Sequence, residues 1–443
     1  MPATEKPART RFERVMHAAW TGTAPGIESV GATAVRASAL PLSFLIQWMA
    51  ARRLGAAGYG QWQALIATID LFAFAGTLGL NNAGIRAAAE YRQRALWALL
   101  NGLHVSVLGL GTGASLLLGG IWLVANSTSP RPWPQGVVTV ACALLATSVA
   151  LELATFLLRG HGRHLLSAVL LHLVRHLGVL ALIGTSTLLL VPPPALAWLI
   201  GAQVLTTTIA AAVATVALVH TVPRALRRTR AYDLAAWLHV SAPLWIAAAS
   251  AMVQVNAGLL IVQRFAPAAD AGAFAASQRI AGFVGFATIL ITLTVAPRIA
   301  IAHAARDRRE VGRLVDMTTW VSVGGGTLLS LAIVLSSKPL LGSLGSEFAA
   351  QPYLLPVLVL AAWMACWSQG AIAALSMAGG ERPLAAVLAC LTMSFLALTY
   401  WGVRTGGVAG AANAAILNAA LSQIALLTLY YSWRRSTRDG TRP

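Results

Sequence analysis

Charged residues are scarce in this sequence. Only 10% of its 443 residues are Asp, Glu, Lys or Arg, whereas an ordinary soluble domain has roughly 25%. Acidic residues are the rarer kind, since 14 of them oppose 32 basic residues. The low charge excludes a conventional soluble enzyme and an intrinsically disordered chain. The basic residues lie in short loops between apolar runs and do not cluster on a soluble face, so the net charge of +18 predicts no nucleic-acid partner.

Cysteines and catalytic motifs are equally sparse. The three cysteines, Cys142, Cys366 and Cys390, lie in apolar runs without metal-ligand spacing, which predicts inert packing residues and no disulfide scaffold. The sequence has no Walker-type loop and no nucleophile constellation. Its loops are too short for a soluble catalytic domain. We therefore expect no enzyme activity, no catalytic residue, no metal and no cofactor. Energy would come from a proton or sodium gradient, the membrane potential or product consumption.

Long apolar runs dominate the sequence instead. Hydrophobic residues make up 57% of it, and the mean hydropathy is +0.71. Runs of about 20 residues cross a bilayer as helices, and they are too long for barrel strands. We predict an all-α polytopic membrane protein with twelve transmembrane helices. The predicted spans are 29–51, 61–84, 97–125, 136–158, 165–191, 195–219, 237–262, 272–297, 317–337, 353–378, 384–402 and 407–432.

The charge of the loops tests these spans independently. If the N-terminus is cytoplasmic, 23 basic residues fall in cytoplasmic segments and 6 in outside loops. Cytoplasmic loops of membrane proteins carry an excess of Lys and Arg. The asymmetry therefore predicts that both termini are cytoplasmic and that the number of helices is even.

Two landmarks recur at nearly one offset, which predicts a duplicated six-helix unit. Arg53 and Arg264 each precede a turn of small residues and lie 211 positions apart, and Arg86 and Arg298 lie 212 apart. A six-helix unit keeps its orientation when repeated, so the two bundles would form a parallel 6+6 repeat around a central cavity. The predicted segments are a cytoplasmic tail (1–26) with an interfacial helix at 11–20, an N-terminal bundle (27–219), a basic cytoplasmic linker (220–236), a C-terminal bundle (237–433) and a basic cytoplasmic tail (434–443).

Several turn and packing motifs resemble those of a transporter superfamily. They are the turn at 52–60, the turn and helix start at 264–280, Pro297-Arg298, Met377–Gly380 and the small-residue run Gly406–Ala412. On these motifs the chain resembles the multidrug/oligosaccharidyl-lipid/polysaccharide exporter superfamily over about residues 27–433. Within it, the chain resembles the flippases of O-antigen or capsule repeat units.

The resemblance implies a function and a location. It implies a multi-pass protein of the bacterial inner membrane that moves a polyprenyl-pyrophosphate-linked glycan across the bilayer by alternating access, for surface polysaccharide synthesis. Membrane lipid, a polysaccharide polymerase and chain-length proteins would be its other partners. Relatives often carry an acid in the seventh helix, where this chain has Asn256, so an ion-coupling role of that helix does not transfer.

Arginines inside the predicted spans are the candidate substrate contacts. Arg36 lies in the first span and Arg279 in the eighth, one in each predicted bundle. Charges in a membrane are costly and normally face a bundle interior or a wet cavity. A guanidinium offers a rigid fork of donors that matches phosphate oxygens, so both residues are predicted to bind the pyrophosphate. The alternative is that each arginine snorkels to a helix end.

The remaining ionisable and polar residues in the spans have two interpretations. Glu152, Arg175 and His172 form either a buried ion pair that holds the fourth and fifth helices together or a proton-responsive coupling cluster. Asp70 is either a second candidate for coupling to protons or sodium or a partner of Arg36 in an ion pair between the first two helices. The candidate sugar contacts are Asn256, Gln278, Trp363 and Trp367, all of which could also simply pack between helices.

Two other transporter functions compete with polysaccharide flipping. A drug/cation antiporter of the same superfamily would favour an acidic cavity, whereas the spans here hold three arginines and two acids. A lipid II-type flippase often has two additional helices, which the predicted spans lack. A third alternative, a membrane glycosyltransferase or polymerase, would need a large outside loop or catalytic acids near the membrane surface, and the sequence has neither.

Overall fold

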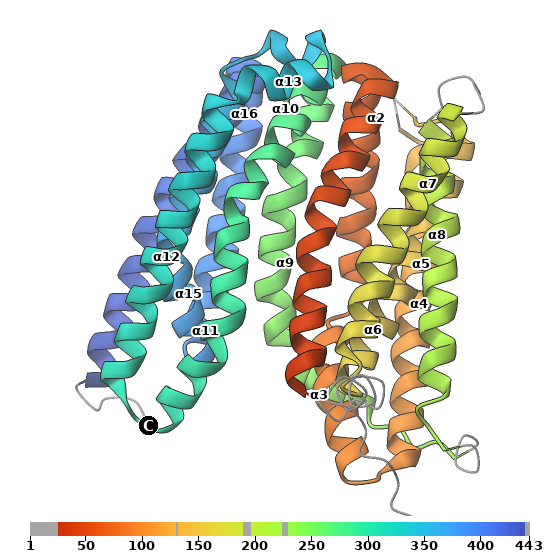
Figure 1. Cartoon of the computed structure of the whole chain (residues 1–443), viewed down its shortest axis with the longest axis vertical. Coiled ribbons are helices and arrows are strands. Elements are labelled where there is room, and N and C mark those ends of the chain that lie inside the picture. Colours follow the sequence, from red (N-terminus) through yellow and green to blue (C-terminus); the bar gives the residue numbers. More distant parts are fainter. Residues whose placement is uncertain (1–24, 130–131, 189–195, 224–228, 439–443) are drawn as a thin grey trace, which may run out of the picture. The chain divides into compact units, whose positions relative to one another are not determined.

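The computed structural model describes residues 25–129, 132–188, 196–223 and 229–438, which are almost entirely helical (Figure 1). No strand occurs in these ranges. Eight of the described helices are long and apolar enough to cross a membrane. Two of them, Gly31–Gly76 and Glu381–Arg435, are longer than one crossing requires, because each runs through a glycine turn. The protein is therefore an all-α polytopic membrane protein, as predicted.

The chain divides into two compact units. The first comprises Met1–Gln47, Gly76–Pro192 and Ala197–Ser241. The second comprises Trp48–Ala75, Pro193–Leu196 and Ala242–Pro443. The stretch Trp48–Ala75 thus packs with the C-terminal part of the chain. The bundle limits at 27–219 and 237–433 stay a prediction.

The first unit is built from the helices of the N-terminal half. The start of α2 (Pro25–Gly76) belongs to it. Its other helices are α3 (Leu80–Gln93), α4 (Trp97–Ser127), α5 (Gln135–Gly160), α6 (His164–Ala168), the π-helix η1 (Val169–Val174), α7 (Arg175–Leu188) and α8 (Leu196–Val219), together with the start of α9 (Leu234–Phe265). The predicted interfacial helix at 11–20 and part of the linker lie outside the described residues.

The second unit contains the rest of α2 and α9 and all later helices. These are α10 (Ala268–Ala281), η3 (Gly282–Gly285), α11 (Phe286–Ala304), α12 (Arg308–Leu335), α13 (Ser337–Leu344), η4 (Ser346–Ala350), α14 (Leu354–Met364), η5 (Ala365–Ser368), α15 (Gln369–Met377) and α16 (Glu381–Arg438). A hydrophobic core joins α11, α12, α15 and α16 through residues such as Ile299, Leu314, Leu375 and Tyr430. Within this unit, the α11–α12 turn and the end of α16 lie at the end opposite to α13 (Figure 1).

The long helices α2 and α16 each correspond to two predicted spans, and a glycine turn inside each helix marks the boundary between the two spans. Gly55 has a φ of 65° inside α2, and Gly407 has a φ of 60° inside α16. Only glycine adopts such angles without steric cost. Each turn falls in or at the edge of the loop between two predicted spans, so the helix pairs 29–51 with 61–84 and 384–402 with 407–432 are recovered.

Two predicted boundaries are wrong in detail. The second span is predicted to continue through 61–84, but Leu78 and Gly79 adopt left-handed angles that end α2 and begin the separate helix α3. The ninth span is predicted to begin at 317, but α12 begins at Arg308, where Asp307 accepts hydrogen bonds from the backbone amides of Arg309 and Glu310 at 3.1 and 3.0 Å. A helix start is fixed by its capping residue, whereas a hydropathy window registers only the apolar part.

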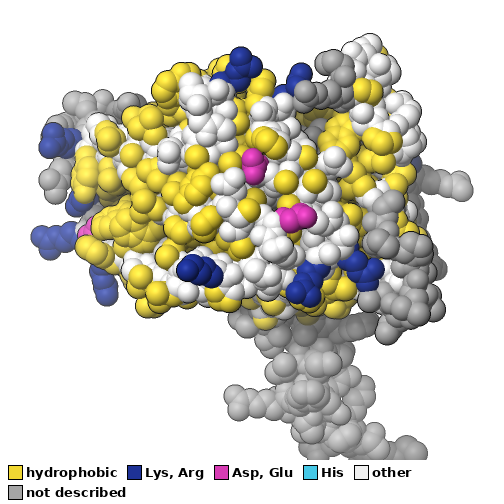
Figure 2. Space-filling view, turned by 90° about the horizontal axis from the view of Figure 1, so that it is seen from above, with side chains coloured by type: hydrophobic (Ala, Val, Ile, Leu, Met, Phe, Trp, Pro, Cys, Tyr) yellow, Lys and Arg dark blue, Asp and Glu magenta, His cyan; other side chains and the backbone are white. Residues whose placement is uncertain are grey.

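Apolar and uncharged atoms make up most of the face that Figure 2 shows, and basic side chains are spread around it. Within the second unit, the turn at Gly55 lies beside the segment after α13, because the amide of Ala56 donates a hydrogen bond to Glu347. The side of the membrane that this segment faces stays a prediction from the loop charges.

Candidate functional site

Arg36 lies among other ionisable residues of the first unit. It is half-buried on α2 and interacts electrostatically with Arg159, which occupies the last turn of α5. Arg159 also interacts with Glu152 on the same helix. Two arginines and one carboxylate therefore share this region, which keeps a net positive charge.

The side chain of Arg159 is held in place by neutral partners. Its Nε donates a hydrogen bond of 2.9 Å to Oγ of Ser167, and its guanidinium lies 4.3 Å from the centre of the Phe156 ring. The sequence pattern places Arg159 in a cytoplasmic loop and misses it as a site residue. The spacing to Glu152 could have indicated it, because residues seven positions apart lie two turns apart on the same face of a helix.

A π-helical turn brings His172 to the same group. His172 lies within η1, and Arg175 directly follows this turn at the start of α7. His172 interacts electrostatically with His176, Arg159, Arg36 and Arg175. A π-turn inserts one residue into a helix and rotates the side chains beyond it, and such turns are frequent at functional sites. The predicted association of His172 with Arg175 thus extends to Arg36, while the pairing of Glu152 with Arg175 stays a prediction.

Glu28 fixes the two chain segments that carry these residues. Its Oε2 accepts a 2.8 Å hydrogen bond from the backbone amide of Leu165, and its side chain also interacts with His164. The amide of Leu165 belongs to the first turn of α6, where helix N–H groups have no partner within the helix. Glu28 is 8% exposed. It therefore ties the start of α2 to the start of α6, and its carboxylate adds a negative charge beside His164, on which Arg36 and Arg159 also act.

Arg279 belongs to the second unit and has a neutral partner. Its Nε donates a 3.2 Å hydrogen bond to Oε1 of Gln63, whose Nε2 donates in turn to the Tyr59 hydroxyl at 2.9 Å. Gln63 and Tyr59 are buried, at 0% and 2% exposure, and Arg279 is half-buried. A guanidinium has five N–H donors, so this contact uses only part of its capacity.

Neither predicted substrate-binding arginine has an acidic partner within reach. In the described part of the chain, ion pairs join Arg94 to Glu90 and Arg313 to Glu310, and no carboxylate lies within 4.0 Å of Arg36 or Arg279. Both cations thus lie on helices of the predicted spans without a described carboxylate at ion-pair distance. Each guanidinium by itself can donate hydrogen bonds to an anion.

The predicted polar contacts are engaged locally. Asn256 is 3% exposed, and its Nδ2 donates to the carbonyl of Met252 at 3.1 Å on the same helix. The Nε2 of Gln278 donates to the carbonyl of Val255 at 3.1 Å, which joins α10 to α9. Asp70 lies half-buried in the second part of α2, within the second unit. The predicted roles of all three in transport stay predictions.

The two predicted tryptophans form part of a cluster on α12. Nε1 of Trp363 donates to Oγ1 of Thr327 at 2.8 Å, and the ring centres of Trp363 and Trp367 are 5.9 Å apart. Trp367 also contacts Trp320 at 6.0 Å, and Trp320 is 66% exposed. This environment agrees with the packing alternative, and a contact with sugar stays a prediction.

Solved transporters resemble the chain over nearly its whole length. It is similar to an inward-facing multidrug resistance MATE family transporter of the MOP superfamily, with a TM-score of 0.71 and 14% identity over 90% of this chain and 95% of that one. It is also similar to the lipid II flippase MurJ in an inward closed conformation, with a TM-score of 0.66 and 10% identity over 91% of this chain and 87% of that one. A mutant of the Vibrio cholerae MATE transporter VcmN gives a TM-score of 0.62 and 15% identity over 91% and 98%.

These similarities establish the fold. The chain has the twelve-helix, two-lobe fold of MOP-superfamily transporters, which confirms the predicted fold class. No family model matches the chain, and no curated protein matches it. The cargo must therefore be argued from the side chains.

Proposed function

We propose that the protein is a flippase of lipid-linked oligosaccharides. It would take a polyprenyl-pyrophosphate-linked repeat unit from the cytoplasmic leaflet of the inner membrane and release it in the outer leaflet by alternating access. The observation that carries the proposal is the pair of half-buried arginines in the predicted spans, Arg36 and Arg279, neither of which has a carboxylate within 4.0 Å among the described residues.

The charge around Arg36 favours an anionic cargo. Arg159 and Arg175 add positive charge to the same group, and its two acids are Glu152, near Arg159, and Glu28, near His164. A half-buried cation without a close counter-ion loses part of its hydration, which is a cost in free energy. Binding a pyrophosphate would recover this cost through charge-assisted hydrogen bonds. An organic cation would instead add repulsion, which argues against the drug/cation antiporter alternative.

The fold agrees with a lipid-linked cargo. MurJ is named as a lipid II flippase, and its fold resembles that of this chain. A lipid II-type substrate would carry the same pyrophosphate, so it is the second candidate cargo. Asp70, Glu152, Arg175 and His172 are the proposed residues for coupling to protons or sodium, or for a structural ion pair. A polysaccharide polymerase and chain-length proteins are the proposed partners downstream.

Binding of a labelled pyrophosphate lipid to the purified protein tests the proposal directly. Arg36→Ala and Arg279→Ala should each weaken binding about ten- to a hundredfold, because each removes a charge-assisted contact with phosphate. Lys at either position should restore part of the affinity, since it keeps the charge and loses the fork. In cells, the double Ala variant should lose surface polysaccharide while its membrane level stays normal.

Arg94→Ala is the matched control. Arg94 pairs with Glu90 on an exposed surface, where both side chains are more than half exposed, so its loss should leave lipid binding unchanged. Normal binding and export by the double Arg36→Ala, Arg279→Ala variant would overturn the proposal. Efflux of cationic dyes by the wild type, abolished by the same variants, would favour the antiporter.

A further inference from the structure

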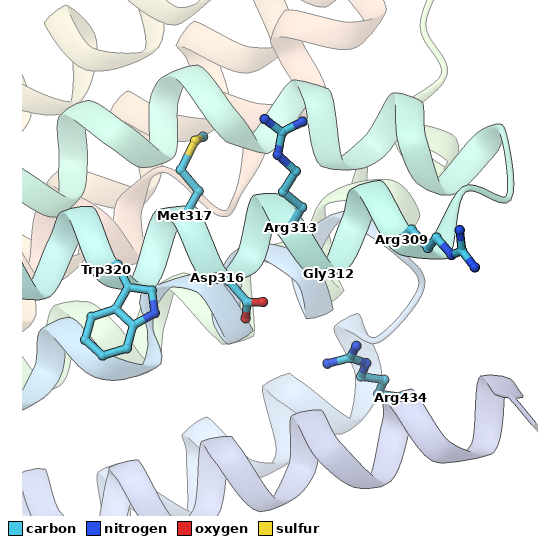
Figure 3. Close-up of a pocket in the computed structure, with 7 residues that line it drawn as sticks. All are labelled: Arg309, Gly312, Arg313, Asp316, Met317, Trp320 and Arg434. Atoms are coloured by element: carbon cyan, nitrogen blue, oxygen red, sulfur yellow. The ribbon is translucent and has the colours of Figure 1, made fainter.

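A groove with a basic lining lies on the second unit, away from Arg279. It opens between the first turns of α12 and the last turns of α16, and its volume is about 550 Å³. Figure 3 shows the side chains around it, with Arg434 reaching from α16 toward α12. The lining residues are Arg309, Gly312, Arg313, Asp316, Met317, Trp320 and Arg434.

The groove carries a net positive charge. Three arginines line it against one acid, Asp316. Arg313 also lies 3.6 Å from Glu310, but this pair is largely exposed and therefore weak. Gly312 leaves the floor open: a Cβ at this position would meet Nη2 of Arg434 at 3.4 Å. A larger residue would fill the space in front of the guanidinium.

Two apolar stripes lead from this groove along the membrane-length helices. The exposed residues on α12 recur at helical spacing and are Met317 (37%), Trp320 (66%), Val321 (48%), Leu328 (72%), Leu331 (55%) and Leu335 (84%). Those on α16 are Leu417 (47%), Leu421 (39%), Ile424 (66%) and Tyr431 (56%). Apolar side chains this exposed on membrane helices face lipid tails. Trp320 lies where the basic and apolar parts meet, which is the position that tryptophan favours in a membrane interface.

We propose that this groove binds an anionic phospholipid. Arg434 and the exposed, flexible side chain of Arg309 would hold the phosphate of the head group, whereas Arg313, whose guanidinium points away from α16 in Figure 3, would add only its charge. The acyl chains would lie along the stripes of α12 and α16. Basic pockets between helices on the cytoplasmic side bind such head groups, and the loop charges assign this end to the cytoplasm. A soluble phosphate would satisfy the arginines but leave the adjoining stripes unused.

Native mass spectrometry of the delipidated full-length protein tests this site with added phosphatidylglycerol. We expect the double variant Arg309→Ala, Arg434→Ala to bind this lipid roughly thirty-fold more weakly than the wild type. The matched control is Arg308→Ala, Arg435→Ala, which removes the same charge from neighbouring exposed residues that do not line the groove. It should keep wild-type affinity.

A second variant distinguishes the contribution of the groove's shape from that of its charge. Gly312→Leu keeps every arginine and fills the space before Arg434, so it should also weaken phosphatidylglycerol binding, while its melting temperature shows that it folds. Phosphatidylcholine should bind weakly to all proteins, and inorganic phosphate at millimolar concentration should not displace the anionic lipid. Equal binding of the two lipids, equal loss in both double variants, or displacement by phosphate alone would overturn the proposal.

Discussion

Gly60 and Gly272 lie in direct backbone contact within the second unit. A Cβ at Gly272 would be 1.9 Å from the carbonyl oxygen of Ala56, and a Cβ at Gly60 would be 2.8 Å from the amide nitrogen of Gly272. The two glycines are 212 positions apart, which is the offset of the predicted repeat. Positions that a two-fold axis relates can meet one another only beside that axis. The contact therefore agrees with a parallel duplication, which superposition of the two halves would test.

Alanine at position 272 should destabilise the protein. The added methyl group would collide with the backbone of α2, which cannot move aside as a side chain can, so α10 must separate from α2. Overpacking of this kind costs roughly 1–3 kcal/mol. We expect Gly272→Ala to lower the melting temperature of the detergent-solubilised protein. Gly113→Ala on α4 is the control, because a Cβ there meets nothing within 4 Å; equal melting temperatures of the two variants would contradict the contact.

The carboxylate of Glu347 stabilises the turn at Gly55 inside α2. Its Oε2 accepts a 2.9 Å hydrogen bond from the amide of Ala56, directly after the turn at Gly55. This amide begins a helical segment and has no partner in its own helix. Glu347→Ala should cost about 1 kcal/mol of stability, as the loss of a helix cap does. Glu347→Gln keeps an acceptor oxygen and should restore most of it in thermal melts.

The control for Glu347 is a carboxylate in an exposed ion pair. Glu90 lies 3.0 Å from Arg94, and both side chains are more than half exposed. Glu90→Ala should therefore have little effect on the melting temperature. If Glu347→Ala were as mild as Glu90→Ala, the hydrogen bond to Ala56 would not support the turn.

The helical type of the fold and two of its turns could be predicted from the sequence, whereas other breaks in the helices could not. Apolar length reveals a membrane helix, and Gly55 and Gly407 lie in small-residue turns that punctuate the runs. The helix break at Leu78 and Gly79 could not be predicted, because Leu78 is apolar and the hydropathy of the sequence does not change there. The π-turn around His172 was also invisible, since it depends on how the helix packs and leaves no composition signal.

The candidate site could be predicted only in part for the same reason. Arg36 stood out because a charge interrupts a long apolar run. Arg159 did not, because an arginine at the end of a run looks like a loop residue. Its proximity to Arg36 depends on the packing of α2 against other helices, which a single sequence does not reveal.

Labelling of single cysteines should verify the sidedness of the helices. In a variant without the three native cysteines, Arg308→Cys places a thiol at the exposed start of α12 and Ser346→Cys places one in the exposed segment after α13. The loop charges predict that an impermeant maleimide added to intact cells labels position 346 alone. Both should react after the cells are permeabilised. Labelling of position 308 in intact cells would reverse the topology.

A buried histidine pair should make stability depend on pH. His161, in the turn between α5 and α6, is 5% exposed, and its Nε2 lies 3.0 Å from Nε2 of His104 and 3.3 Å from Oγ1 of Thr221. Two facing imidazole nitrogens form a hydrogen bond only if one of them is unprotonated. Burial, together with the charges of His104, Arg92 and Arg163, lowers the pKa of His161 to about 3.

The sign of the effect follows from this lowered pKa. Histidine in the unfolded chain has a pKa of about 6.5, so below this pH the side chain is protonated in the unfolded state, whereas His161 stays neutral in the folded state. The free energy of unfolding therefore falls between about pH 6.5 and pH 3, by about 2 kcal/mol from pH 7 to pH 5. His161→Gln keeps a hydrogen-bonding side chain without titrating, so its melting temperature should fall less over this interval. His220→Gln, on an exposed residue, should match the wild-type slope. Identical slopes for all three proteins would show that His161 takes up a proton in the folded state.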